Sequence, residues 1–113
     1  DNLDGALIAT GGRNRYLEGE IEVQRQLGEA NSFMRQSGSA ALDLAYIATE
    51  RLDGLYLRGL GRWDMAAGVL LVTEAGGLVG DFEGGANFMK NGNIVAGSPR
   101  CFKAISSVVR KNL

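Results

Sequence analysis

Hydrophobic residues along the chain form short continuous runs in some places and helix-spaced sets in others. Short apolar runs between glycines and polar turn residues predict strands at residues 3–10, 55–57, 78–82 and 94–97. Apolar residues at helical spacing predict helices at residues 17–34, 40–51, 63–75 and 99–111. The stretches 11–15, 35–39 and 83–87 and the Asn-Gly turn at 90–93 are expected to be loops. This order predicts an α/β domain, with a mixed β-sheet flanked by α-helices.

The helix at 63–75 begins at a carboxylate, Asp64, and ends at the paired glycines Gly76 and Gly77. Its apolar residues occur on all sides, so we expect it to be buried on most of its surface, with a left-handed glycine as its stop. An aspartate at a helix start can accept an unpaired backbone N–H and is stabilised by the helix dipole. From the pattern alone, Asp64 is equally consistent with a helix cap and with a metal ligand.

The helix at 40–51 follows a loop of small polar residues. We expect Ser37 or Ser39 to cap it, and its apolar stripe leaves Asp43 off the buried side. A helix start preceded by Ser-Gly-Ser presents free N–H groups, to which a hydroxyl or an anion can dock. An ordinary capped helix without a ligand explains the same residues equally well.

Length and composition restrict the class of protein. A chain of 113 residues, 45% hydrophobic and 22% charged, fits one globular domain over residues 1–113. The net charge of −1 predicts neither nucleic-acid binding nor attachment to an anionic membrane. No apolar run is long enough to span a bilayer, and no secretory leader opens the chain. Together with a single cysteine, Cys101, these features predict a cytoplasmic protein.

The chain contains no histidine. This absence excludes Ser-His and Cys-His nucleophile pairs, histidine general bases and histidine metal ligands. Oxygen ligands remain, and carboxylates suit Mg²⁺ or a similar hard cation better than they suit zinc. The chain also begins at Asp1 rather than at a methionine, so we expect it to be a piece of a longer protein.

Three segments, in this order and spacing, resemble the inositol monophosphatase family, most closely its bacterial extragenic-suppressor-type members. They are RQSGSAALDLAY at 35–46, WDMAAG and VTEAGG at 63–68 and 72–77, and GNIVAG at 92–97. The resemblance covers essentially the whole chain. It implies the C-terminal α/β domain of an inositol-monophosphatase-like sugar phosphatase fold.

The resemblance further implies a Mg²⁺-dependent phosphomonoesterase that hydrolyses inositol monophosphate or a related sugar phosphate. Most of the family's metal ligands belong to an N-terminal half that is missing here, so the fragment alone is expected to be inactive. The expected partners are the small phosphate ester, the N-terminal half of the same protein and a second copy in a homodimer. By similarity Asp64 is a catalytic metal ligand that also contacts a substrate hydroxyl. Gly38, Ser39 and Ala40 match the stretch that lines the inositol, chiefly through backbone groups.

One position departs from the family pattern. Leu57 stands seven residues before Asp64, where the family has a glutamate that binds inositol hydroxyls. The side chain of leucine cannot accept a hydrogen bond, so the identity of the substrate remains undetermined. We expect the next residue, Arg58, to be a solvated surface arginine rather than a contact for a second phosphate. Two alternatives are a fructose-1,6-bisphosphatase-like enzyme and a non-catalytic dimerisation or protein-binding module of a bacterial relative that acts in transcription antitermination.

Overall fold

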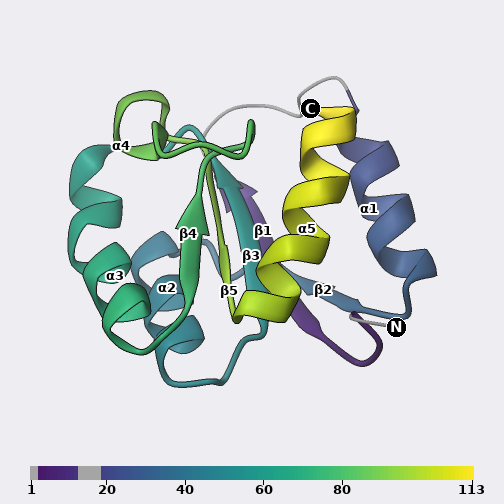
Figure 1. The fold of residues 1–113 in the computed structure, drawn as a ribbon, viewed down its shortest axis with the longest axis horizontal. Helices are drawn as coiled ribbons and strands as arrows, with labels where there is room; N and C mark the ends of the chain where they lie inside the picture. The colour runs from purple at the N-terminus through teal and green to yellow at the C-terminus, as the bar shows by residue number, and fades with distance from the viewer. Residues whose placement is uncertain (1–2, 13–18) are drawn as a thin grey trace.

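The computed structural model describes residues 3–12 and 19–113, which form a mixed sheet between two layers of helices (Figure 1). The five strands lie in the order β2-β1-β3-β5-β4. Their bounds are β1 (Leu7–Gly12), β2 (Phe33–Arg35), β3 (Gly54–Arg58), β4 (Leu78–Gly80) and β5 (Ile94–Gly97). Strand β1 is parallel to β2 and β3, whereas β5 is antiparallel to β3 and β4. The predicted mixed sheet is confirmed.

Each face of the sheet carries its own pair of helices (Figure 1). The bounds are α1 (Glu20–Glu29) and α5 (Pro99–Asn112) on one face, and α2 (Ala40–Ala48) and α3 (Arg62–Glu74) on the other. A short fifth helix, α4 (Phe88–Asn91), lies beyond the end of β4. Among the described residues, no helix combines the length and apolar character needed to cross a membrane.

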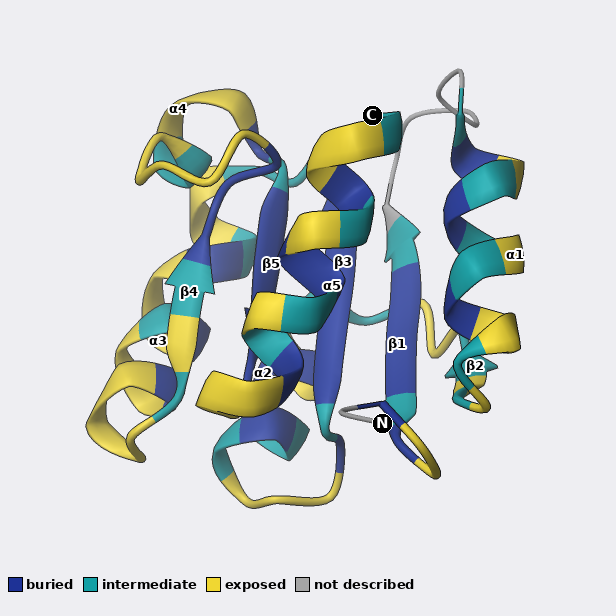
Figure 2. Ribbon diagram, turned by 45° about the vertical axis from the view of Figure 1, so that its right-hand side comes forward, coloured by how far each residue is buried: buried dark blue, intermediate teal, exposed yellow. Residues whose placement is uncertain are grey.

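The central strands are buried because both of their faces are covered by helices, as the dark strands of Figure 2 show. Successive side chains of a strand point to opposite faces of the sheet. Ile8 and Tyr56 therefore belong to the core beneath α1 and α5. Ala9 and Leu57 belong to the core beneath α2 and α3. The sheet thus separates two apolar cores that share the same strands.

The predicted helix at 17–34 is wrong at its C-terminal end. Helix α1 ends at Glu29, Asn31 takes a left-handed conformation with φ of 65°, and Phe33–Arg35 forms strand β2. The backbone N–H of Phe33 donates to Ala6 O at 2.8 Å. Residues 33–35 therefore form a strand because they pair with β1, although their apolar residues also match helical spacing. Residues 17 and 18 lie outside the described residues.

Several other boundaries differ from the prediction. Gly11 and Gly12 belong to β1 rather than to a loop, and residues 13–15 of that predicted loop lie outside the described part. Helix α2 stops at Ala48, strand β4 stops at Gly80, and α4 occupies a region predicted as loop and turn. The glycine stop of α3 is confirmed, because Gly76 has φ of 90°.

Helix α3 is not buried on most sides, contrary to the prediction. Met65, Gly68 and Val72 form a narrow buried stripe, while Trp63 is 96% exposed and Leu70 is 60% exposed. The stripe is close to α2 because a Cβ at Gly68 would lie 2.6 Å from atoms of Leu44. The helix therefore uses one face for the described core and presents apolar side chains on another.

Candidate functional site

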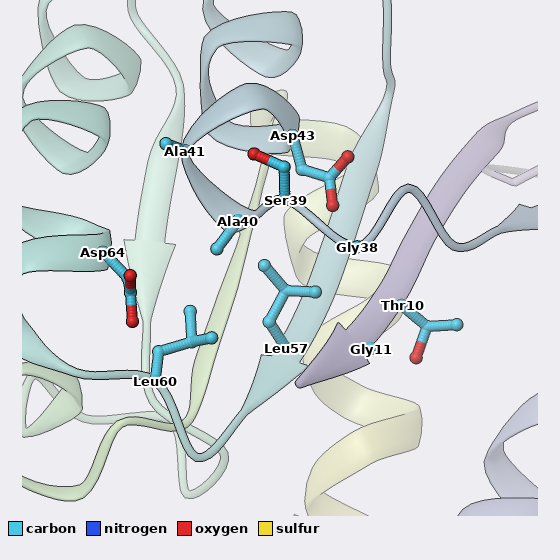
Figure 3. A pocket seen from close by; sticks show the side chains of 10 residues that line it. All are labelled: Thr10, Gly11, Gly38, Ser39, Ala40, Ala41, Asp43, Leu57, Leu60 and Asp64. Atoms are coloured by element: carbon cyan, nitrogen blue, oxygen red, sulfur yellow. The ribbon is translucent and has the colours of Figure 1, made fainter. Parts of the chain in front are cut away.

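A cavity of about 320 Å³ opens at the carboxyl ends of β1 and β3, beside the starts of α2 and α3 (Figure 3). Its lining brings together all four predicted site residues from two separate helix starts. The lining residues are Thr10, Gly11, Gly38, Ser39, Ala40, Ala41, Asp43, Leu57, Leu60 and Asp64. A small phosphate ester fits a space of this size.

Chain topology explains why a cavity forms at this point. After β1 the chain continues to α1 on one face of the sheet, whereas after β3 it continues to α3 on the opposite face. Strands β1 and β3 are parallel neighbours, so the two chain segments diverge at the same edge and leave a crevice between them. In open α/β sheets this divergence is the usual place for a ligand.

The start of α2 is arranged by its serines. Ser39 is the N-cap, and its Oγ accepts a hydrogen bond from Leu42 N at 3.2 Å. The Ser39 N–H in turn donates to Ser37 Oγ at 3.1 Å. Among the described residues, no group accepts a hydrogen bond from the N–H of Ala40 or Ala41, and both residues line the cavity. These two N–H groups are available to a phosphate or hydroxyl oxygen of a ligand.

Asp64 lies in the first turn of α3 and serves as part of its cap. Its Oδ2 accepts a hydrogen bond from Gly61 N at 3.0 Å. The predicted capping role is therefore confirmed. The expectation of a buried helix start is wrong, because Asp64 is only partly buried and the neighbouring Trp63 is solvent-exposed. The same carboxylate lines the cavity, so capping and ligand binding are compatible roles.

The residues present fit a hard metal ion only in part. Asp64 offers a carboxylate at the cavity wall, which suits Mg²⁺. Within residues 3–12 and 19–113, no group of three or more His, Cys, Asp or Glu side chains could hold a metal ion. The described residues therefore do not form a metal site by themselves, and Asp64 is a single oxygen ligand at the cavity wall.

Asp43 is a cavity residue that the sequence reasoning did not assign. It was expected off the buried side of its helix, but only 1% of its surface is exposed. Burial raises the pKa of its carboxyl group, against the opposing effects of the hydrogen bond from Ser37 and the charge of Arg35. Its position four residues after the cap Ser39 was the available signal, because that spacing puts it in the first turn of α2. Helix packing against the sheet then buries that side.

Arg58 is buried, so the predicted solvated arginine is wrong. It is 5% exposed, its Nη1 donates to Gly11 O at 2.9 Å, and it lies 3.4 Å from Glu20 Oε1. Glu20 also accepts a hydrogen bond from the Tyr56 hydroxyl at 2.6 Å. Burial and the neighbouring Glu20 raise the pKa of Tyr56. This network joins the ends of β1 and β3, and Arg58 also lines a second cavity that shares Thr10, Gly11 and Gly38 with the first.

Comparison with known proteins gives one family across almost the whole chain. Residues 3–112 match the model of the inositol monophosphatase family. The chain is 49% identical over 115 aligned positions to the Nus factor SuhB of Escherichia coli K12, covering 99% of this chain and 43% of that protein. It is 43% identical to the inositol-1-monophosphatase of Mesorhizobium japonicum, covering 100% of this chain and 42% of that protein.

Solved structures show the same fold. The extragenic suppressor protein suhB of Bartonella henselae has a TM-score of 0.86 and 39% identity, over 96% of this chain and 43% of that one. An inositol monophosphatase from Anabaena has a TM-score of 0.85 and 32% identity, over 98% of this chain and 46% of that one. The chain thus spans less than half the length of the relatives that it matches.

Proposed function

Because this chain belongs to the inositol monophosphatase family, we propose that it supplies the C-terminal half of a Mg²⁺-dependent phosphomonoesterase. The substrate is inositol monophosphate or a related sugar phosphate. One observation carries the proposal: Asp64 and the free N–H groups of α2 line the same cavity from two different helix starts. A carboxylate and a set of amide donors suit an ester that has both a metal-bound phosphate and hydroxyl groups.

Each of the four predicted site residues has a defined part in this proposal. Asp64 is a metal ligand, kept in place by its hydrogen bond from Gly61 N. The backbone at Gly38, Ser39 and Ala40 contacts the sugar or inositol, and the left-handed conformation of Gly38, with φ of 82°, shapes that loop. When bound, Mg²⁺ supplies an activated water and stabilises the charge of the leaving oxygen.

The isolated chain is not expected to hydrolyse phosphate esters. Its described residues lack a group that could complete a metal site, and the relatives are more than twice as long. We propose that an N-terminal half provides the remaining ligands and that the complete protein is a cytoplasmic homodimer. Turnover by the 113-residue chain alone would contradict this part of the proposal.

The direct test is hydrolysis of inositol 1-phosphate by the full-length protein with Mg²⁺, compared with its Asp64→Asn variant. Asparagine keeps an oxygen for the Gly61 N–H but loses the charge that holds the metal, so kcat/KM should fall by about 100-fold or more. Asp53→Asn is the matched control, because Asp53 also accepts a backbone N–H, from Leu7, but lies outside this cavity. Equal activity of wild type and Asp64→Asn would refute the ligand assignment.

A second candidate function is a protein-binding module in transcription antitermination. The relative with 49% identity is named a Nus factor, and α3 exposes an apolar stripe that includes Trp63 and Leu70. Such a stripe is typical of a protein-binding surface. Absence of turnover on any phosphate ester, combined with antitermination activity that Trp63→Ala removes, would favour this function over the enzyme.

A further inference from the structure

The cavity contains a second carboxylate besides Asp64. Among the described residues that line it, only Asp43 and Asp64 carry a carboxylate. They come from α2 and α3, and Figure 3 shows them on different sides of the cavity, with Ala40 and Leu57 between them. A ligand held at Asp64 therefore meets a second acidic group across the cavity.

The hydrogen bonding of Asp43 is incomplete. Its Oδ1 accepts a hydrogen bond from Ser37 Oγ at 2.7 Å, and among the described residues no donor reaches Oδ2. Asp81, another buried carboxylate, accepts backbone N–H bonds from Glu83, Gly85 and Asn87. Because no donor in the described part of the chain occupies Oδ2, this oxygen is able to accept a hydrogen bond from a bound molecule.

The other lining side chains do not replace this acceptor. Leu57 and Leu60 are apolar, and Ser39 Oγ already accepts the hydrogen bond of its own helix cap. Thr10 Oγ1 is buried without a hydrogen-bond partner among the described residues, but a neutral hydroxyl is a weaker acceptor than a carboxylate. The backbone at the start of α2 presents N–H donors rather than acceptors. Apart from Asp64, the strongest acceptor for a ligand O–H is therefore Asp43.

We propose that Asp43 accepts a hydrogen bond from a free hydroxyl of the substrate and so determines a preference for phosphate esters of polyols. This inference rests on the proposed phosphatase function. Asp43 is a specificity-determining residue here, because it binds a part of the substrate away from the phosphorus. Its hydrogen bond from Ser37 occupies Oδ1 and leaves Oδ2 for the ligand.

The test uses the full-length protein with Mg²⁺ and two substrates, inositol 1-phosphate and p-nitrophenyl phosphate, of which only the first carries free hydroxyls. Asp43→Ala should lower the ratio of their kcat/KM values, inositol 1-phosphate over p-nitrophenyl phosphate, by about tenfold, because a hydrogen bond to a charged group is lost. Asp43→Asn should fold in the same way and lower the ratio by a smaller factor, since a neutral amide replaces the carboxylate. An unchanged ratio in a folded variant would overturn the proposal.

Ser37→Ala is the matched control for an indirect effect. It removes the partner of Asp43 Oδ1 but leaves the carboxylate in the cavity. The ratio should fall much less than in Asp43→Ala, whereas an equal fall in both variants would show that Asp43 acts only by holding the loop.

A comparison of substrate analogues provides an independent check. The wild-type protein should lose about tenfold in kcat/KM on at least one mono-deoxy analogue of inositol 1-phosphate, and this loss should disappear in Asp43→Ala. Equal rates on all deoxy analogues would refute the inference while leaving the phosphatase function intact. Absence of turnover on every ester would instead refute the proposed function, and this inference with it.

Discussion

The two faces of the sheet differ most where β1 and β3 end. On the α1/α5 face, Tyr56 and Arg58 are buried in a polar network with Glu20. On the α2/α3 face, the neighbouring residues Gly11 and Leu57 line an open cavity. Side-chain alternation along β3 thus puts the arginine of the ion pair and the leucine that lines the cavity on opposite faces of the sheet.

The comparison shows why polar residues next to a candidate site need not belong to it. Arg58 follows Leu57 directly, yet its guanidinium is bound by Gly11 O and Glu20. Both members of the ion pair are almost fully buried. Its contribution is therefore to hold two strand ends together, while small and apolar residues leave space for a ligand.

The largest expected effect comes from removing the buried polar network on the α1/α5 face of the sheet. Glu20→Ala leaves Arg58 buried without its carboxylate and the Tyr56 hydroxyl without its acceptor, so the free energy of unfolding should fall by about 3–5 kcal/mol. Urea denaturation of the full-length protein measures this. Replacing both Glu20 and Arg58 with methionine should be far less harmful, because no buried charge remains. A loss below about 1 kcal/mol in Glu20→Ala would contradict the role of the network.

The next effect concerns the close approach of α2 and α3, which cover the other face of the sheet. Gly68→Ala places a methyl group 2.6 Å from Leu44 atoms, and such overpacking should cost about 1–3 kcal/mol. Gly28→Ala in α1 is the matched control, because a Cβ there meets no atom within 4 Å. It should raise stability by up to about 1 kcal/mol. Thermal unfolding of both variants distinguishes a packing effect from helix propensity.

A smaller effect compares the caps of the two sides. Ser39→Ala removes the cap of α2 and Ser98→Ala removes the cap of α5, and each should cost about 1 kcal/mol of stability. Only Ser39 lines the cavity. Phosphatase activity should therefore fall in Ser39→Ala and stay near wild type in Ser98→Ala, measured under conditions where both variants are folded. Equal activities would show that the Ser39 cap is not needed to hold the backbone at the start of α2 in its binding position.

The smallest effect is a dependence of stability on pH. The pKa of Asp43 is raised in the folded protein, so its ionisation opposes folding, and stability falls as the pH rises from the unfolded-state pKa through the folded-state pKa. Asp43→Asn should remove this dependence of stability on pH and leave stability at pH 7 unchanged or slightly higher.

Asp81 has a pKa shift of the opposite sign. Although burial opposes its ionisation, its backbone hydrogen bonds lower its pKa, so the ionised group stabilises the fold above the unfolded-state pKa. Asp81→Asn should therefore lose stability at pH 7, as measured by denaturation at several pH values.

Local sequence signals predicted much of the fold. Ser98 followed by Pro99 marked the start of α5, and Gly76 marked the end of α3. The residues 33–35 were assigned to a helix because their apolar spacing fits one. Only pairing with β1 makes them a strand, and that partner is far away in the sequence.

The same division holds for the candidate site. By itself, the sequence determined the class of fold, the capping carboxylate of Asp64 in the first turn of α3 and the serine-rich start of α2, because capping acts between residues three or four apart. Only the tertiary structure decided that both helix starts share one cavity and that Asp43 and Arg58 are buried. Burial and proximity depend on which face of the sheet a helix packs against, and that is set by contacts between segments distant in the chain.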